Sequence, residues 1–91
     1  MIEIMAILKQ NETDDGRIFR LVENTYRDPS NNIFDIFGYE YLIQIKILFF
    51  WITIKSYEYT FDAEMDVDEV NKEIDYRKFL AEEYYEFVIN N

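Results

Sequence analysis

Carboxylates are the side chains of this sequence with the most capacity for chemistry, and their spacing suggests two kinds of site. In DAEMDVDE, residues 62–69, acidic residues alternate at positions 62, 64, 66 and 68. A calcium-binding loop has a similar alternation, but it requires glycine at its sixth position to make a sharp turn. Counted from Asp62, that position is Val67. We therefore predict no metal site in this segment.

The second pattern is a row of acidic residues at helical spacing near the C-terminal end. At about 100° per residue, one edge of a helix carries Asp68, Asp75, Glu82 and Glu86. Separations of seven residues place successive carboxylates about 10 Å apart along a helix. Such a row can imitate a phosphate backbone and bind a groove lined with Lys and Arg. The alternative is that the row is the solvated face of an amphipathic helix.

Residue types that many enzymes use are missing from the chain. It contains no histidine and no cysteine, so the commonest general base, the commonest metal ligand and thiolate chemistry are all excluded. Gly16 and Gly38 are isolated and build no phosphate-binding loop. We therefore predict that the protein is not an enzyme and uses no cofactor.

Negative charge is concentrated in the last third of the chain. The sequence has 19 acidic and nine basic residues, which gives a net charge of −10. Residues 62–91 hold ten acidic and three basic residues, a net −7, which leaves −3 for the other 61 residues. Such a chain repels nucleic acid and attracts basic surfaces, including those with which other proteins hold nucleic acid. The alternative is that the charge only keeps the protein soluble.

The first part of the chain has the alternation of β-strands. A strand with one buried face is predicted for the start of the chain, where one set of side chains alternates with another. The first set is Ile2, Ile4, Ala6 and Leu8, and the second is Glu3, Met5, Ile7 and Lys9. Asp15-Gly16 predicts a hairpin turn. Residues 17–27 are predicted to form a second strand, although their apolar spacing also fits a helix. Residues 28–32 contain the only proline and predict a loop.

Residues 39–61 are predicted to form a hairpin. As one uninterrupted strand they would be about 75 Å long, which exceeds a small domain. The alternation changes phase at Leu48-Phe49, so we place the corner there. We expect the apolar segment KILFFWITIK, residues 46–55, to lie mainly in the core, as a corner and the start of a central strand covered on both faces. The aromatic residues at 49–51 are expected to reach a partner surface.

The same apolar segment is too short for a membrane span. Lys46 and Lys55 enclose only eight apolar-rich residues, whereas a spanning helix needs about 20. The N-terminus, MIEIMAILKQ, has Glu3 where a secretory signal carries positive charge. We therefore expect a cytoplasmic protein that does not bind membranes.

After Glu64 the periodicity becomes helical and predicts a helix over 65–90. Asp66 is the expected N-cap, and Glu69 completes a capping-box pattern. Arg77 interrupts the apolar stripe, so it must extend to solvent, pair with a carboxylate or mark a kink near 75–78. The stripe expected to pack on the sheet consists of Val67, Val70, Ile74, Ala81, Tyr84, Tyr85 and Val88.

A second apolar stripe lies on nearly the opposite side of the predicted helix. It consists of Tyr76, Phe79, Leu80 and Phe87. Leaving these side chains in water would expose an apolar patch of several hundred Å². The stripe therefore predicts an interface with a second copy, as in a homodimer, or with another protein.

Together these elements predict an α+β fold in a single domain, residues 1–91. Residues 1–61 are expected to form an antiparallel β-meander of three to four strands. The acidic C-terminal α-helix is expected to pack against one face of that sheet, because one of its stripes is apolar.

The segment YEYLIQIKILFFWITIKSYEYTF, residues 39–61, followed by an acidic helix, resembles small proteins encoded by phages and mobile elements. In those proteins an aromatic run such as LFFW lies inside a meander, and the resemblance extends over residues 17–90. It implies an accessory or anti-defence role, like that of acidic anti-CRISPR and anti-restriction inhibitors that occupy the nucleic-acid groove of a host nuclease. Those inhibitors share composition rather than sequence, so the resemblance transfers no binding residue to this chain.

Two functional hypotheses follow. In the first, the protein is a nucleic-acid mimic that inhibits a host defence protein by presenting the acidic residues to a basic surface, with aromatic residues beside them as anchors. It would then bind no nucleic acid directly. In the second, the protein is a homo-oligomeric structural or interaction module, and its charge has no mimicking role.

Overall fold

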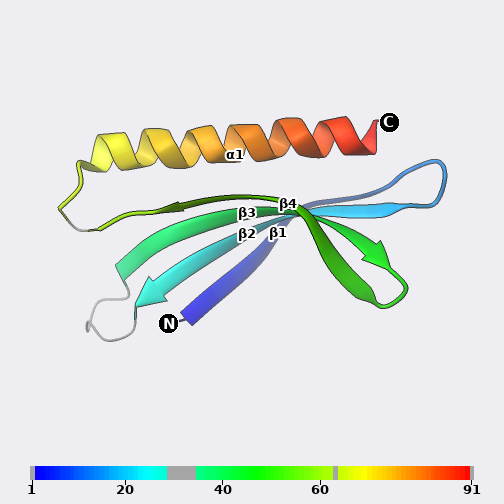
Figure 1. The fold of residues 1–91 in the computed structure, drawn as a ribbon, viewed down its shortest axis with the longest axis horizontal. Helices are drawn as coiled ribbons and strands as arrows, with labels where there is room; N and C mark the ends of the chain where they lie inside the picture. Colours follow the sequence, from blue (N-terminus) through cyan, green and yellow to red (C-terminus); the bar gives the residue numbers. More distant parts are fainter. Residues whose placement is uncertain (1, 29–34, 63, 91) are drawn as a thin grey trace.

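The chain forms a four-stranded antiparallel sheet with one helix along one face (Figure 1). The computed structural model describes residues 2–28, 35–62 and 64–90. The sheet order follows the sequence, which makes it a simple meander. Its elements are β1 (Ile2–Glu12), β2 (Ile18–Asp28), β3 (Asp35–Ile47), β4 (Phe50–Thr60) and α1 (Val67–Ile89).

The predicted α+β class and meander are confirmed, and the segment 17–27 is a strand rather than a helix. The predicted turn at Asp15-Gly16 is also confirmed. Gly16 has φ +87°, in the left-handed region that glycine adopts without a steric penalty. Apart from Asp28, the predicted loop at 28–32 lies outside the described residues.

The core lies between α1 and the face of the sheet that we call the helix face. Alternate residues of β2 and β3 point to this side, because successive side chains of a strand point to opposite faces. Six buried residues form the core cluster, with Tyr85 and Ala81 contributed by the helix. The strand residues of this cluster are Phe19, Leu21, Tyr41 and Ile43. This packing confirms most of the predicted apolar stripe of the helix, but Val67 is 70% exposed and lies outside the core.

The opposite face of the sheet, which we call the open face, has buried positions of its own. Val22 and Leu42 are direct partners across β2 and β3, and both are buried. Gly38 is also buried there, and a Cβ added to it would lie 3.1 Å from the Thr60 side chain and 3.3 Å from the Tyr59 carbonyl oxygen. Glycine at this position therefore permits close packing of β3 against β4.

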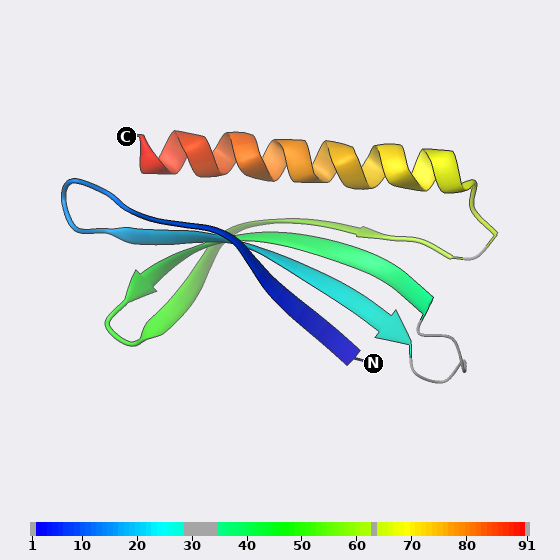
Figure 2. The same cartoon turned by 180° about the vertical axis from the view of Figure 1, so that it is seen from behind.

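Strand β1 contradicts the prediction that it has one buried face. All its described side chains, from Glu3 to Glu12, are exposed. The helix packs mainly on β2, β3 and β4, and it meets β1 only near the end of that strand, at Lys9 and Asn11. Figure 2 shows this strand running along the uncovered side of the sheet to the N-terminus. A bulge at Leu8, between the paired residues Ile7 and Lys9, also interrupts its regular pairing with β2.

The β3–β4 hairpin turns at Leu48-Phe49, as predicted, and Leu48 takes the left-handed conformation with φ +57°. The expected core position of 46–55 is wrong. Most residues of this segment are exposed, with Leu48 at 81% and Phe49 at 91%. β4 is an edge strand, and Figure 1 shows the hairpin, in green, bending away from the helix. The twist of the sheet therefore removes this segment from the layer that would cover it.

A bulge in β4 changes the face of the sheet to which its side chains point. Its register with β3 shifts between Ile43 and Gln44, where Lys55 and then Thr53 are the partners on β4. Thr53 and Trp51 consequently lie on the open face, while Lys55 and the tyrosines beyond it lie on the helix face. Simple alternation along β4 did not predict this change, because a bulge adds one residue to one strand only.

Trp51 is held against β2 by a small polar group on the open face. The Arg20 guanidinium lies 4.1 Å from the centre of the Trp51 ring. Arg20 Nε donates a hydrogen bond to Gln44 Oε1 at 2.6 Å, and Gln44 Nε2 donates to Thr53 Oγ1 at 3.1 Å. This group links β2, β3 and β4 near the exposed end of the hairpin.

Helix α1 begins as predicted and runs without a kink. The Asp66 side chain accepts a hydrogen bond from the Asp68 backbone N–H at 2.9 Å, which is N-cap geometry. The helix is continuous through 75–78, so Arg77 does not divide it into two. Arg77 pairs with Glu73 and lies 4.9 Å over the Tyr59 ring, which satisfies its charge at the edge of the core. Among the described residues, no helix has both the length and the apolar composition of a membrane span.

Candidate protein-binding surface

The acidic residues predicted to form a row lie along one flank of α1. Asp68, Asp75 and Glu86 are exposed, and Glu82 is half-buried. The four positions fall within about 40° of one another around the helix, at about 100° per residue. Their span of 18 residues corresponds to about 27 Å at about 1.5 Å per residue. We call these four residues the acidic row.

The acidic row lies on the side of the helix that faces the first two strands. Lys9 Nζ is 3.5 Å from Glu86 Oε1. The Tyr85 hydroxyl donates a hydrogen bond to Asn11 Oδ1 at 2.6 Å. Both Lys9 and Asn11 belong to β1, whose described side chains are exposed. The row is therefore bordered by open surface, which a partner can approach.

Most of the acidic row has no basic partner. In the part of the chain that the structure describes, the ion pairs are Lys9–Glu86, Arg17–Asp15 and Arg77–Glu73. Within these described residues, Glu86 alone of the row is paired, and its side chain is half exposed. The three other carboxylates add a negative field that extends about 8 Å into solvent at physiological ionic strength.

A second acidic group lies on the sheet below the row. The Tyr41 hydroxyl donates a hydrogen bond to Glu23 Oε2 at 2.9 Å. Burial raises the pKa of Tyr41, and the hydrogen bond and charge of Glu23 and the charge of Asp75 raise it further. Tyr41 consequently stays protonated and keeps donating its hydrogen bond to Glu23. The acidic character of this side therefore continues from the helix to the sheet.

The second apolar stripe occupies the outer side of α1, next to the acidic row. Tyr76, Phe79 and Phe87 are exposed, and Leu80 is half-buried. Phe79 is four residues from Asp75, so the two are separated by about 40° around the helix. The ring centres of Tyr84 and Phe87 are 6.4 Å apart, which connects the end of the stripe to the core edge. Aromatic and acidic side chains therefore share one accessible surface.

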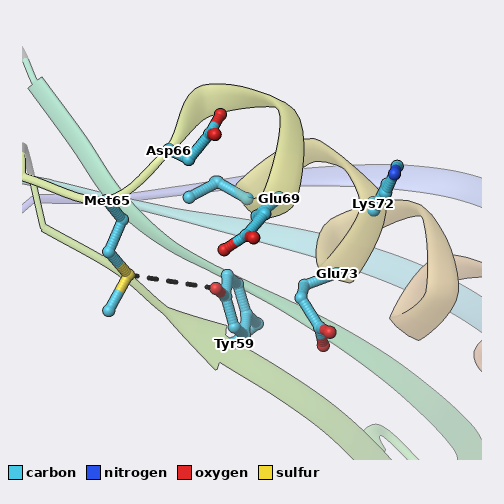
Figure 3. A pocket seen from close by; sticks show the side chains of 7 residues that line it. Tyr59, Met65, Asp66, Glu69, Lys72 and Glu73 are labelled. Carbon is cyan, nitrogen blue, oxygen red and sulfur yellow. Dashed lines mark hydrogen bonds between the residues drawn. The ribbon is translucent and has the colours of Figure 1, made fainter.

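A pocket of about 530 Å³ opens at the start of α1, beside β4 (Figure 3). Figure 3 shows Glu69 and Glu73 on the side of the helix near Tyr59, with Lys72 directed away. The Tyr59 hydroxyl is 4.0 Å from the Met65 sulfur. Sequence reasoning missed this pocket. Its acidic residues are visible in the sequence, but their position beside Tyr59 depends on how the helix packs on β4.

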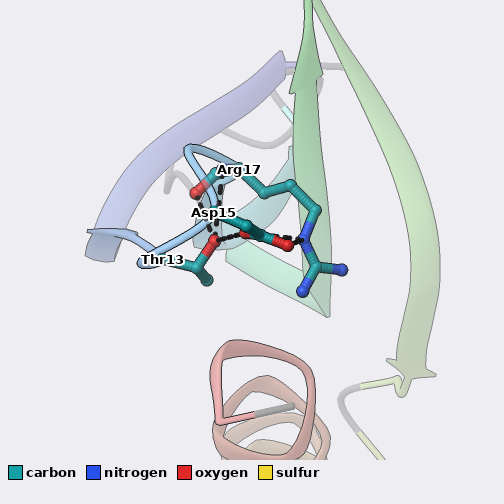
Figure 4. Close-up of polar contacts among 3 residues, drawn as sticks. All are labelled: Thr13, Asp15 and Arg17. Atoms are coloured by element: carbon teal, nitrogen blue, oxygen red, sulfur yellow. Dashed lines mark hydrogen bonds and ion pairs between the residues drawn. The ribbon is translucent and has the colours of Figure 1, made fainter.

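The β1–β2 turn holds a third group of polar side chains (Figure 4). The Thr13 hydroxyl donates to the Asp15 carboxylate, and Arg17 Nε lies 2.9 Å from Asp15 Oδ2. The hydrogen bonds from Thr13 and then from Arg17 lower the pKa of Asp15 below its ordinary value. The Arg17 backbone N–H also donates to Thr13 Oγ1 at 3.1 Å. These contacts join residues of the turn to one another and hold the turn closed.

The acidic segment 62–69 uses its side chains for local structure. Asp62 Oδ1 accepts a hydrogen bond from the Glu64 backbone N–H at 3.0 Å, and Asp66 caps the helix. Within residues 2–28, 35–62 and 64–90, no three His, Cys, Asp or Glu residues are grouped so that they could hold a metal ion.

Comparison with known protein families, curated proteins and solved structures finds no match for this chain. A functional proposal therefore depends on the chemistry of the surfaces described above. Of these surfaces, the flank of α1 combines exposed carboxylates of the acidic row with exposed rings of the aromatic stripe.

Proposed function

We propose that the protein is a non-enzymatic acidic binding protein of phage type, which occupies a basic nucleic-acid-binding surface of a host defence protein. In this role it acts in the host cytoplasm as an anti-defence inhibitor, such as an anti-CRISPR protein. The target surface, for example that of a host nuclease, is lined with Lys and Arg. The acidic row would take the place of nucleic-acid phosphates on that surface.

The observation that supports this proposal is the alignment of exposed carboxylates along one flank of α1. Asp68 and Asp75 are exposed, and neither forms an ion pair among the described residues. Binding therefore breaks no existing ion pair at these two positions. A partner that brings Lys or Arg side chains to the row gains charge-assisted hydrogen bonds, which are among the stronger polar contacts.

The acidic row would raise the rate of association with the partner, and the aromatic stripe would supply most of the affinity. An exposed ion pair contributes only about 0–1 kcal/mol, whereas long-range attraction raises the association rate strongly. Aromatic residues are the commonest anchors of protein interfaces. Phe79 borders the row, so a partner that covers Asp75 can also bury this ring.

The decisive experiment reverses the charge of the row. The protein is used to capture partners from a bacterial lysate at low and high salt, and each captured protein is tested for release of a labelled DNA duplex. Changing the acidic row to Lys at all four positions should slow association at least tenfold and abolish release of the duplex. A single Asp75→Asn change should have little effect, because each exposed charge contributes little.

A matched control separates the position of the charges from their number. Reversing Glu3, Glu12, Asp14 and Glu64 to Lys also changes the net charge by +8, from −10 to −2. These four residues are exposed and lie outside the row. The control variant should still bind and still release the duplex. If both fourfold variants behave alike, or if neither differs from the wild type, the row is a solvated face and the proposal is wrong.

The exposed stripe supports the second candidate function, a homo-oligomeric module. Tyr76, Phe79 and Phe87 are 56%, 57% and 64% exposed. Pairing of two such stripes in a homodimer would remove apolar area from water. Replacing Phe79 and Phe87 with Ser should then yield a folded monomer, because neither ring belongs to the core cluster. Light scattering tests this idea, and a wild type that is monomeric at high micromolar concentration would reject it.

A further inference from the structure

We propose that the protein associates head to tail with copies of itself. The tip of the β3–β4 hairpin of one copy, which we define as residues 47–50, enters an apolar pocket beside the start of α1 in the next copy. Both surfaces lie outside the acidic row and the aromatic stripe. The inference therefore does not rest on the inhibitor function, and it places self-association on other residues than the aromatic stripe.

The hairpin tip is the most exposed apolar feature of the molecule among the described residues. It contains Ile47, Leu48, Phe49 and Phe50, and Phe50 is 70% exposed. Figure 1 shows the hairpin projecting away from the helix and the remainder of the sheet. A convex apolar projection of this kind buries area only when it enters a concave surface.

The surroundings of the tip carry positive charge in an otherwise acidic protein. Residues 41–57 contain no acidic residue, and Lys46 is next to the tip. Lys55 lies farther along β4, with its Nζ 5.9 Å over the Tyr84 ring of α1. Arg20 adds a third cation through its position over the Trp51 ring. The partner of the tip should therefore combine an apolar hollow with negative charge.

The chain itself has such a hollow at its other end. A pocket of about 230 Å³ lies where the start of α1 meets β3 and the end of β4. A dry cavity of about 150 Å³ accepts a benzene molecule, so this pocket has room for a phenylalanine ring. The apolar residues that line it are Tyr39, Phe61, Met65, Val67, Val70 and Ile74.

Charge and exposure at this pocket match those of the tip. Residues 58–67 contain four acidic residues and no basic residue. Asp62 lines the pocket itself. Met65 and Val67 are 45% and 70% exposed, so part of the lining is apolar surface left in water. A second copy that inserts Phe49 would cover this surface and bring its Lys46, which is next to the tip, toward these carboxylates.

The geometry requires that the contact joins two different molecules. The tip and the pocket lie at opposite ends of β4, which has 11 residues and is therefore about 36 Å long at about 3.3 Å per residue. The molecule is 47 Å long in its longest dimension, so a copy cannot insert its tip into its own pocket. Because the two contacting surfaces differ, the association is heterologous and builds an open chain or a closed ring.

The test uses one variant for each surface. Phe49→Asp removes the apolar tip, and Val67→Lys places a positive charge in the pocket wall. Both residues are highly exposed, so both variants should keep the wild-type circular dichroism spectrum. By analytical ultracentrifugation, the mass of the wild type should increase with concentration, and each variant alone should associate at least tenfold more weakly.

Mixing the two variants gives the sharpest outcome. The Phe49→Asp protein retains its pocket and the Val67→Lys protein retains its tip, so an equimolar mixture should form a 1:1 dimer that grows no further. A mixture that stays monomeric at wild-type association concentrations overturns the proposal. So does a Phe87→Asp control that abolishes association as strongly as Phe49→Asp, because it would assign the interface to the aromatic stripe.

A membrane surface is the other class of partner for an exposed apolar loop with lysines. Sedimentation with phosphatidylserine–phosphatidylcholine vesicles distinguishes it from self-association. The proposal expects the wild type to self-associate as its concentration rises and to show negligible binding to vesicles. Binding to vesicles that Phe49→Asp abolishes, in a protein that shows no self-association, overturns it in favour of a lipid surface.

Discussion

Two tyrosines with glutamate partners are the residues whose ionisation is most strongly linked to folding. The Tyr26 hydroxyl donates to Glu40 Oε1 at 2.6 Å, and the Tyr41 hydroxyl donates to Glu23. Burial, followed by the hydrogen bond to its glutamate, raises the pKa of each tyrosine. A phenol in such a site donates only while it is protonated, so its contribution to stability is lost when the pH becomes high enough to ionise it.

The sign of this dependence gives the first prediction. A group with a raised pKa in the folded state contributes stability that is complete below its unfolded pKa, about 10 for tyrosine, and is lost as the pH rises through the folded pKa. The free energy of unfolding should therefore fall steeply above about pH 10. Denaturant unfolding at several pH values measures this fall.

Single substitutions identify the residues responsible. Tyr41→Phe should cost about 1–3 kcal/mol at neutral pH, because it removes a hydrogen bond to a charged group, and should make the alkaline loss of stability smaller. Tyr76→Phe changes an exposed tyrosine and should alter neither quantity. Equal pH profiles for Tyr41→Phe and the wild type would show that general charge repulsion causes the alkaline loss.

For individual residues, contacts between neighbours in the sequence were predictable, and contacts between residues far apart in the sequence were not. The Asp66 N-cap could be predicted, because a cap bonds a backbone N–H only two residues away. The bond from Tyr41 to Glu23 joins residues 18 positions apart. It depends on the register of β2 against β3, which alternation along one strand does not determine.

At the scale of the elements, the β3–β4 hairpin is attached to the sheet by the group around Arg20. We predict that Arg20→Met destabilises the protein by about 1–2 kcal/mol, because it removes a cation–π contact with Trp51 and a hydrogen bond to buried Gln44. Trp51 is the only tryptophan, so its fluorescence reports this region directly. Its emission should shift to longer wavelength in the variant as water reaches the ring.

The control for this prediction keeps the positive charge and removes the planar guanidinium group. Arg20→Lys retains a cation but cannot both stack on the ring and hydrogen-bond through Nε, so it should recover only part of the loss. A full recovery by Lys would show that charge alone holds the hairpin. An Arg17→Met variant, whose arginine lies 5.5 Å over Phe19, should leave Trp51 emission unchanged.

The position of the apolar segment 46–55 was not predictable from its composition. Apolar residues indicate a preference for burial, but burial also requires another element above them. The helix covers β2, β3 and β4 along its own length, and the twist of the sheet turns the hairpin away from it. Element types and the corner at Leu48-Phe49 depend on local pattern, and these predictions are confirmed.

At the scale of the whole molecule, the net charge of −10 opposes the folded state, because folding brings the carboxylates of α1 close to one another and to Glu23. Raising the salt concentration from about 0.01 M to about 1 M shortens the screening length from about 30 Å to about 3 Å. We predict that this change stabilises the protein by about 1 kcal/mol and raises Tm by about 4–8 °C. Calorimetry at the two salt concentrations measures the shift.

The charge-reversed proteins provide the comparison. With four acidic residues changed to Lys, the net charge falls to −2. The variant reversed in the acidic row should lose most of the salt dependence, because its changes lie within the densest negative region. A Tm that rises equally with salt in this variant and the wild type would contradict an origin in charge repulsion.

The candidate site was partly predictable at this scale. The acidic row and the aromatic stripe follow from helical periodicity within one element, so their positions on α1 agree with expectation. The two pockets beside the start of α1 depend on side chains from β3, β4 and the helix together. No pattern within a single element indicates them, because they result from the distance at which the helix packs on the sheet.

Because the helix leaves most of β1 uncovered, this strand should be the first part of the sheet to unfold locally. Its backbone hydrogen bonds connect it to β2 alone, and all its described side chains are in contact with water. Regions with few buried contacts open at a lower free energy than the core. Amide protons of β1 should therefore exchange with solvent well before those of β2 and β3, so the edge strand can detach transiently while the helix and the three remaining strands stay folded.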